Sequence, residues 1–272
     1  MTSRVDVIIV SYNTADDLVA CLQSVTSAQP HSLGRILVVD NASADGSPDR
    51  VLSLFPGVEV LRLAENIGFA AANNRALRQC TAELVLLLNS DTVVPPGAID
   101  RLVERLDQTG AVVAGPRLVD ARGRPEVSFG AMISPWAEWR QRKLVRQAAS
   151  DAPADREAIA RHVATERFVD WVSGACLLVR RQEALDAGGL DERYFMYEED
   201  VDFCAAIRAR GGRVLFAPGI EIQHLRGRSM ARAGGGASAY YVRSHLAFYE
   251  KHHPLWVWPL RVWMRLRGRS VR

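Results

Sequence analysis

Short apolar runs alternate with segments of helical spacing along the first hundred residues. The runs are rich in Val, Ile and Leu and predict strands over Val5–Val10, Ile36–Val39, Val58–Leu63 and Leu84–Leu88. Helices are predicted over Asp16–Ser27, up to Phe55, over Ala70–Arg78 and from Pro95-Pro96 onward. Continuous rather than alternating apolar runs are typical of strands covered by helices on both faces. The pattern therefore predicts an α/β fold with a mostly parallel central sheet.

Short polar side chains follow each of these four strands. They include Asn13, Asp40, Asn66 and Asp91. The carboxyl ends of parallel strands share one edge of a sheet, where ligands of open α/β sheets bind. We therefore expect a polar ligand there, although such residues also end strands and cap helices without binding anything. No GxGxxG follows the first strand and no GxxxxGK[ST] is present, which argues against a dinucleotide dehydrogenase and a P-loop enzyme.

Composition narrows the class of protein. The chain has 272 residues, 48% of them apolar, and a formal net charge of +3. This apolar fraction is typical of a folded protein, and the net charge is too small to indicate nucleic acid as a partner. No apolar run approaches the roughly 20 residues that cross a bilayer, and the first residues lack a secretory signal pattern. The spacing of the cysteines fits neither zinc nor a redox pair, so buried thiols in a reducing cytosol are expected for Cys21, Cys80, Cys176 and Cys204.

Several ordered motifs together resemble glycosyltransferase family 2, with the bacterial rhamnosyltransferase-like branch as the nearest likeness. The motifs are Val5–Asn13, Val38–Ser47, Asn66–Asn74, Leu86–Asp91, Val172–Ala175 and Tyr194–Asp202, followed by His224 and Ser229. The resemblance covers about residues 5–125 and 169–253.

This resemblance implies a GT-A fold, a nucleotide-sugar donor, a divalent cation (Mg²⁺ or Mn²⁺) and inversion at the anomeric carbon. We expect a catalytic domain over residues 1–230, with a donor half at about 1–125 and an acceptor half at about 126–230. A Gly-rich loop and an amphipathic tail are expected over residues 231–272.

The family pattern assigns roles on the donor side. Asn89-Ser90-Asp91 stands at the DXD motif of the family, with Asn in place of the first Asp, which makes Asp91 the main metal carboxylate. His224 is expected to bind the metal or the diphosphate, against the alternative of a packed histidine. For Asn73 and Asn74 a role on the helix surface is the alternative. The expected donor-binding residues are Tyr12, Asn13, Asp40, Asn41, Asn66, Gly68, Asn73, Asn74, Ser90 and Arg228.

The acceptor side carries a run of acids, Glu198-Glu199-Asp200, and then Asp202. An attacking hydroxyl needs a base, and a carboxylate is the usual one. The resemblance assigns Asp200 as this base and Glu199 as an acceptor contact, with Glu198 and Asp202 structural. Acids in a first helical turn also interact favourably with the helix dipole, which is the simpler explanation. Gly174 and Trp171 are expected at the acceptor site, where an indole face stacks on a sugar; a core position is the alternative for Trp171.

Two regions combine tryptophans with basic residues. Residues 131–168 are the least family-like and contain Trp136 and Trp139 beside Arg140–Lys143; acceptor or membrane contact and a surface helical insertion are both open. Pro254–Leu266 holds three tryptophans, and the segment from Lys251 to Arg272 has six Lys or Arg and no acid. Such a stretch suits an interfacial helix. Packing on the catalytic domain or a dimer contact is the alternative.

The sequence thus predicts an inverting, metal-dependent sugar transferase at the inner face of the cell membrane. The favoured donor is dTDP-rhamnose, with UDP-sugars second, and the favoured acceptor is a polyprenyl-linked saccharide of the cell envelope. A nucleotidyltransferase and a nucleotide-sugar-binding module without turnover are the alternatives.

Overall fold

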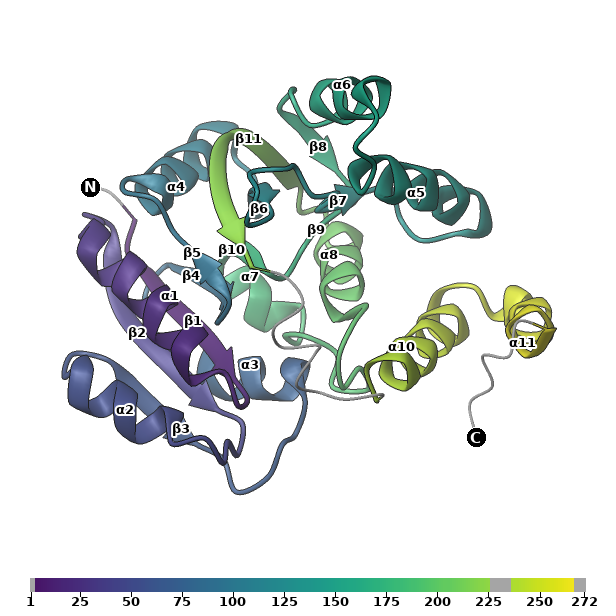
Figure 1. The fold of residues 1–272 in the computed structure, drawn as a ribbon. Coiled ribbons are helices and arrows are strands. Elements are labelled where there is room, and N and C mark those ends of the chain that lie inside the picture. Colours follow the sequence, from purple (N-terminus) through teal and green to yellow (C-terminus); the bar gives the residue numbers. More distant parts are fainter. Residues whose placement is uncertain (1–2, 226–235, 267–272) are drawn as a thin grey trace.

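The computed structural model describes residues 3–225 and 236–266. Strands and helices alternate through the first half (Figure 1). The strands are β1 (Val5–Ser11), β2 (Leu33–Asp40), β3 (Glu59–Arg62), β4 (Leu84–Asn89), β5 (Thr92–Val93), β6 (Val113–Val119), β7 (Phe129–Gly130), β8 (Arg167–Val169), β9 (Trp171–Val172), β10 (Cys176–Arg180) and β11 (Val214–His224). The helices are α1 (Ala15–Ala28), α2 (Ser47–Leu54), α3 (Phe69–Leu77), α4 (Ala98–Thr109), α5 (Pro135–Ala148), α6 (Pro153–His162), α7 (Arg181–Asp186), α8 (Glu199–Ala209), α10 (Gly236–His252) and α11 (Val257–Leu266), with a 3₁₀ turn η1 (Pro254–Trp256).

A nine-stranded sheet forms the centre, in the order β3-β2-β1-β4-β10-β6-β11-β5, with β8 paired to β11. The first four strands are mutually parallel, and β6 is parallel to β11. Because β10 is antiparallel to both β4 and β6, those two run in the same direction. The mostly parallel sheet predicted from the apolar runs is confirmed.

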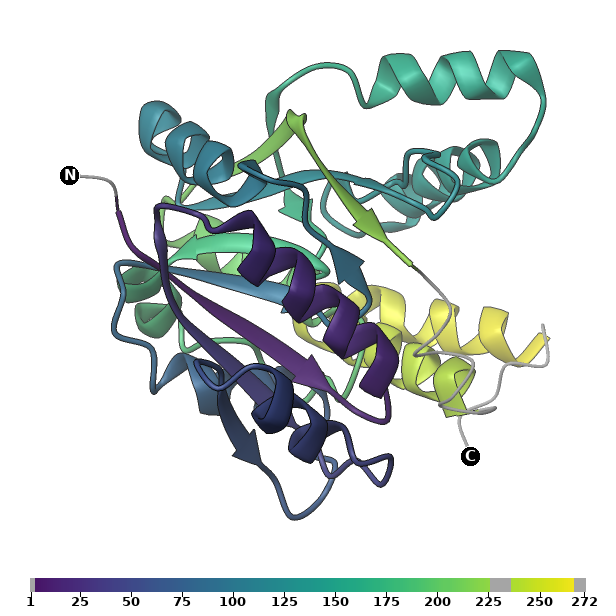
Figure 2. The ribbon, with the colours of Figure 1, turned by 60° about the vertical axis from the view of Figure 1, so that its left-hand side comes forward.

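Helices cover both faces of this sheet (Figures 1 and 2). Successive residues of β4 show the cause: Leu84, Leu86 and Leu88 pack with α1, α2 and α4, while Val85 and Leu87 pack with α3 and α8 on the other face. Each strand is therefore apolar on both sides. The four cysteines are free and buried, as expected.

The predicted elements are present with small shifts at their ends. The helix expected from Pro95-Pro96 begins later, at Ala98, because Gly97 stands before it with a left-handed φ of 73°. The long strand β11 ends at His224, one of the residues that the resemblance singles out.

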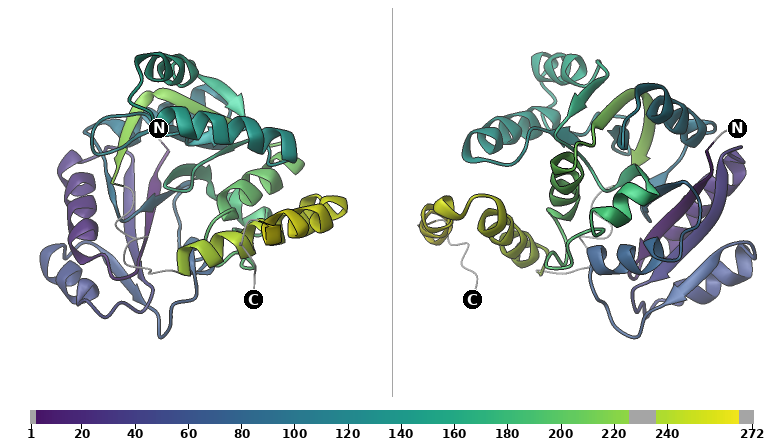
Figure 3. Two further views of the ribbon diagram at one scale, coloured as in Figure 1. Left: turned by 45° about the vertical axis from the view of Figure 1, so that its right-hand side comes forward. Right: turned by 180° about the vertical axis from the view of Figure 1, so that it is seen from behind.

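The C-terminal helices α10 and α11 lie on the side of the molecule that carries α5 and α8, away from β1–β3 (Figures 1 and 3). Phe248 and Tyr249 of α10 are buried with Tyr194 and Val201, and Leu260 of α11 packs against this cluster. In the two described ranges, no helix is long and apolar enough to span a bilayer.

Candidate active site

The carboxyl ends of β1, β2 and β4 meet at one edge of the sheet. Ser11 pairs with Asp40, and Val10 pairs with Asn89, so polar strand ends stand side by side as the sequence predicted. Asp40 is buried at 4% exposure, and one of its oxygens accepts weakly from the Ser43 backbone N–H at 3.4 Å. Among the described residues its Oδ1 has no hydrogen-bond partner. A buried carboxylate oxygen left this way suits a ligand that donates a hydrogen bond.

The loops after β1 and β2 are bound to each other through Asn13. Its side-chain oxygen accepts from the Ala44 N–H (2.8 Å), and its own N–H donates to Ser43 Oγ (2.9 Å). Asn13 has a left-handed φ of 54°, which asparagine tolerates better than most residues. Tyr12 beside it is 43% exposed, so its ring is available to a ligand.

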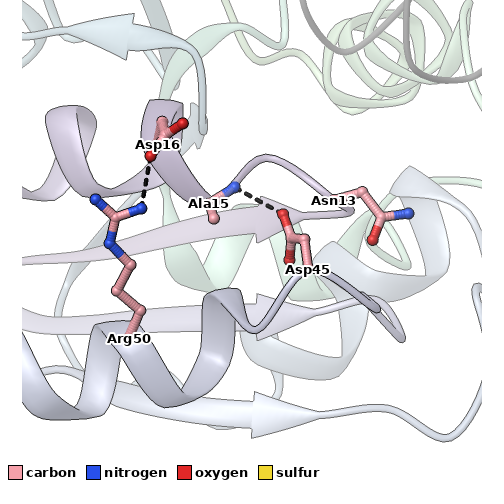
Figure 4. Close-up of a pocket in the computed structure, with 5 residues that line it drawn as sticks. All are labelled: Asn13, Ala15, Asp16, Asp45 and Arg50. Carbon is pink, nitrogen blue, oxygen red and sulfur yellow. Dashed lines mark hydrogen bonds and ion pairs between the residues drawn. The ribbon is translucent and has the colours of Figure 1, made fainter.

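A surface pocket adjoins this pair of loops (Figure 4). It is lined by Asn13, Ala15, Asp16, Asp45 and Arg50. Asp45 accepts from the Ala15 N–H at 2.9 Å, and Arg50 forms an ion pair with Asp16 at 2.5 Å. These contacts hold α1 and the start of α2 together at the outer edge of the predicted donor site.

Asn41 and Asn66 connect the ends of β2 and β3. The Asn41 amide donates to Asn66 Oδ1 (2.8 Å) and to the Gly68 carbonyl (3.2 Å), and its oxygen accepts from the Ile67 N–H (2.9 Å). Both Asn41 amide hydrogens are therefore used within the protein. Gly68 has a φ of 86°, and a Cβ on it would stand 2.6 Å from the Phe195 carbonyl oxygen. Donor contacts of these residues remain predictions, but the structure gives each of them a role in shaping the loop.

The two asparagines of α3 are buried. Asn73 donates to the Phe69 carbonyl at 2.9 Å. Asn74 donates to the Leu190 carbonyl (2.8 Å) and to Glu192 (2.9 Å), and accepts from the Leu190 N–H (2.9 Å). The helix-surface alternative is wrong, since both side chains are at most 2% exposed. Asn74 joins α3 to the segment that leads to the acids, and a donor contact of either residue stays a prediction.

Asp91 and His224, distant in sequence, lie together because β5 pairs with the end of β11. His224 Nε2 is 3.3 Å from Asp91 Oδ1, and its Nδ1 is 3.2 Å from Glu126 Oε2. Burial disfavours the charged imidazole, but hydrogen bonds from Asp91 and Glu126, with their negative charges, outweigh burial and raise the pKa of His224 to about 9. Ser90 is buried beside them, with its Oγ 3.0 Å from Thr14 Oγ1.

The Asp91–His224 pair fits a divalent cation. Adjacent ligands of an octahedral ion, each at about 2.1 Å, stand about 3.0 Å apart, close to the 3.3 Å between Nε2 and Oδ1. Glu126 orients the other imidazole nitrogen, as carboxylates behind metal-binding histidines do. Among the residues that the structure describes, no three His, Cys, Asp or Glu side chains are arranged as a complete metal site. A cation that takes its other ligands from a diphosphate and from water requires only such a pair of protein ligands.

The acid run lies across the same edge of the sheet. Asp200 Oδ2 accepts from the Gly174 N–H at 2.8 Å, and its Oδ1 accepts from the Val201 N–H at 2.8 Å. The next carbonyl, of Ala175, accepts from the Asn89 N–H at 2.9 Å. The short segment Gly174–Ala175 thus stands between the predicted base and the metal-binding motif, and it brings the two predicted centres together.

Glu199 and Glu198 are buried beside Asp200. Burial and the charges of Asp200 and Glu198 raise the pKa of Glu199 well above its usual value. Among the described residues, Oε2 of Glu199 has no hydrogen-bond partner. A raised pKa favours the neutral carboxyl, which can donate a hydrogen bond as well as accept one.

The remaining predicted residues are Trp171, Arg228 and Ser229. Trp171 is half-buried, packs beside two core clusters and donates its indole N–H to the Ala131 carbonyl at 2.9 Å. Its sugar contact remains a prediction. Arg228, Ser229 and most of the predicted Gly-rich loop lie outside the described residues.

Sequence reasoning missed Glu126 and His245. Glu126 contacts a histidine 98 positions away, and His245 contacts Glu198 47 positions away. Neither residue lies in a motif, so no local signal marks it.

Comparison with known proteins identifies the family of the chain. Residues 6–155 match Glycosyl transferase family 2. The chain is 29% identical to the N-acetylglucosaminyl-diphospho-decaprenol L-rhamnosyltransferase of Mycobacterium tuberculosis, over 97% of this chain and 90% of that protein. It is 29% identical to the pre-mycofactocin glycosyltransferase of the same organism, over 80% of this chain and 43% of that protein.

Solved structures share the fold at low identity. GalNAc-T7 with UDP, GalNAc and Mn²⁺ superposes with a TM-score of 0.67 at 16% identity, over 92% of this chain and 48% of that one. The mannosyltransferase PcManGT of Pyrobaculum calidifontis, with GDP-Man and Mn²⁺, gives 0.61 at 18% identity, over 92% of this chain and 64% of that one. The expected GT-A fold is confirmed. With its motifs in place along the carboxyl edge of such a sheet, the chain belongs to glycosyl transferase family 2.

Proposed function

We propose that the protein is an inverting, metal-dependent glycosyltransferase that moves rhamnose from dTDP-rhamnose to a polyprenyl-linked saccharide. The observation that carries the proposal is the juxtaposition of Asp91 and His224 with Asp200 across the Gly174–Ala175 segment. Cation ligands on one side and a fixed carboxylate on the other are the two requirements of direct sugar transfer.

Asp200 acts as the base in this proposal. Its carboxylate takes the proton of the acceptor hydroxyl while the hydroxyl oxygen bonds to the anomeric carbon. The bond from that carbon to the diphosphate oxygen breaks at the same time, and the nucleoside diphosphate leaves with the electron pair. Attack from the face opposite the leaving group inverts the anomeric configuration.

Asp91 and His224 would hold the cation, with Glu126 orienting the imidazole. A bound Mg²⁺ or Mn²⁺ offsets the negative charge that develops on the leaving diphosphate. The structural relatives solved with Mn²⁺ support a divalent ion without distinguishing it from Mg²⁺.

The buried Asp40, the loop at Asn13 and the exposed Tyr12 form the proposed nucleotide site. The M. tuberculosis rhamnosyltransferase matches nearly the whole chain, and its name supports both rhamnose as the sugar and N-acetylglucosamine on a polyprenyl diphosphate as the acceptor. Such an acceptor belongs to cell-envelope synthesis and lies in a membrane, so we also propose peripheral contact with the inner face of the cell membrane through α11.

A panel of nucleotide sugars tests this function. The chain is incubated with Mn²⁺, a polyprenyl diphosphate N-acetylglucosamine and dTDP-rhamnose, UDP-glucose or UDP-galactose, and released nucleoside diphosphate is measured. We expect dTDP release that requires both acceptor and cation, and a product of inverted configuration by NMR. Release from UDP-sugars alone would overturn the choice of donor, and release from none of the three would overturn the transferase proposal for these substrates.

A further inference from the structure

The loop before α8 lies residue by residue against α10. Four consecutive loop positions each contact a side chain of that helix, through two aromatic pairs and two hydrogen bonds. The pairs are Phe195 with Tyr240 (ring centroids 4.5 Å), Met196 with Ser244 (2.7 Å), Tyr197 with Tyr241 (6.0 Å) and Glu198 with His245 (2.9 Å).

The loop needs this support because its backbone is strained. Tyr197 and Glu198 have φ values of 73° and 69°, in the left-handed region that favours glycine. Such a backbone conformation is costly for a residue with a side chain and persists only where surrounding contacts hold it. Since α8 begins at Glu199, the two strained residues determine where the first turn of α8, with Asp200, is placed.

His245 is the central contact of the loop with α10. It is 2% exposed, with Nδ1 2.9 Å from Glu198 and Nε2 3.3 Å from Glu138 of α5. Tyr249 donates its hydroxyl to the same Glu138 oxygen. The imidazole therefore joins three segments of the chain: α5, α10 and the loop.

A second contact lies on the other side of Asp200. Asp202 forms an ion pair with Lys251 (2.8 Å) and a hydrogen bond with His252 (2.6 Å), both at the end of α10. Glu198 and Asp202 thus bind α10, while Asp200 between them binds the Gly174 N–H. Within the acid run, Glu198 and Asp202 therefore anchor the segment to α10, and Asp200 between them faces the sheet.

We propose that α10 is a brace for this loop and that His245 is a positioning residue, which sets the placement of Asp200 through its hydrogen bond to Glu198. The proposal rests on the proposed role of Asp200 as the base. His245 itself touches no reacting atom, and Glu138 serves to orient its ring.

Amide hydrogen exchange of residues 194–202 tests the brace without any substrate. In His245→Asn the amide nitrogen replaces Nδ1 and still reaches Glu198, whereas in His245→Gln it replaces Nε2 and reaches only Glu138. We expect exchange in the loop to rise at least tenfold in His245→Gln and less than threefold in His245→Asn. Arg243→Ala, an exposed position on the same helix, is the matched control and is expected to leave exchange unchanged. Equal exchange in both His245 variants, or none above wild type, would overturn the proposal.

Kinetics then separate positioning from simple destabilisation. His245→Gln is expected to lower kcat for sugar transfer at least tenfold with the donor KM within twofold, and His245→Asn to recover most of the loss. A loss shared equally by Asn and Gln, or confined to KM, contradicts the proposal.

Two further measurements keep the outcome decisive. Where the His245 variants fail to fold, Glu198→Ala removes the same contact from the loop side, and unchanged exchange in it would overturn the brace. A wild-type chain that transfers no sugar would overturn the proposed function instead, and exchange alone would then decide the brace.

Discussion

The carboxylate of Asp200 accepts hydrogen bonds from two backbone N–H groups, those of Gly174 and Val201, which fix its direction. Asp200→Asn keeps the shape of the side chain but removes the ability to accept a proton. We expect kcat to fall by about 10²–10⁴ with donor affinity nearly unchanged. Transfer rates and calorimetric titration with the nucleoside diphosphate provide the two measurements. Full activity with the wild-type pH dependence would exclude Asp200 as the base.

Asp91 gives a separate prediction on the donor side. In Asp91→Ala the candidate cation site loses its carboxylate, so nucleoside diphosphate affinity measured in Mn²⁺ should fall and become insensitive to EDTA. Asp49→Asn, an exposed acid of α2 paired with Arg62, serves as the control and should bind like wild type. Wild-type affinity that is the same with and without cation would contradict the prediction.

His245 predicts how stability depends on pH. Burial opposes its charge, but hydrogen bonds with Glu138 and Glu198 and their charges raise the pKa of His245 from 6.5 to about 9. Because the folded-state pKa is the higher one, this stabilisation is fully present below about pH 6.5 and is lost as pH rises through 9. The shift corresponds to up to about 3 kcal/mol for this buried group.

Urea unfolding between pH 6.5 and 10 measures that contribution. The free energy of unfolding of wild type minus that of His245→Gln should be largest at pH 6.5 and shrink toward pH 10. Tyr249, which also binds Glu138, is present in both proteins, so its contribution to the free energy of unfolding cancels in the difference. His162→Gln is the control, because burial lowers the pKa of His162 and no such decline is expected. A constant difference across this range would refute the assignment.

At the scale of elements, the predictable part is the part with local contacts. The apolar runs of β1, β2 and β4 are continuous because both sheet faces bury them, and the sequence shows that directly. The polar residues at the ends of these strands were predicted from the same apolar runs. Strands β10 and β6 were not predicted, because their place in the sheet depends on partners far away along the chain. Glu126 and His245 were missed for the same reason, since pairing over 98 and 47 positions leaves no periodic signal.

Helix α11 has two apolar faces, and only one of them is covered. Leu260 packs on the cluster around Phe248, and Met264 is 4% exposed. On the opposite side Leu255, just before the helix, is 90% exposed and Trp258 is 74% exposed. The packing alternative accounts for the inner face only. An outer face of this kind beside Arg261 and Arg265 suits a surface of anionic lipid.

Sedimentation with anionic liposomes checks this face. Wild type should pellet with the vesicles at low salt, whereas a double variant Leu255→Ser, Trp258→Ser and a chain ending at His253 should stay in the supernatant. Leu54→Ser removes an exposed leucine of α2 and is the matched control, expected to pellet like wild type. Equal sedimentation of all forms would assign α11 a purely structural role.

At the scale of the whole molecule, one sheet joins two halves that contribute different parts of the site. Residues before 125 supply Asp40 and Asp91, whereas the acids and His224 come after it. Within the sheet, the halves are joined by the strand pairs β4–β10, β6–β10, β6–β11 and β5–β11. Loop contacts add to these pairs, among them Asn74 with Leu190 and the Phe69 N–H with the Phe195 carbonyl (2.7 Å). These loop contacts lie next to the candidate site, so the structure links the loops of the proposed donor side to the acids of the proposed acceptor side over short paths.

The strand order also has a consequence for how the chain folds. Strands β3-β2-β1-β4 are complete by residue 89. The pairs β1–β2 and β2–β3 join strands that are nearby in sequence, whereas Val5 of β1 pairs with Leu84 of β4. The Leu-rich edge of β4 is covered only when β10 arrives, with Cys176 opposite Leu88, and β10 in turn must meet β6. Such long-range pairing is slow, so β1, β2 and β3 should gain protection early and β6, β10 and β11 late in pulse-labelled refolding. Since Gly174 and Ala175 lead directly into β10, activity should emerge only with this last, slow closure of the sheet.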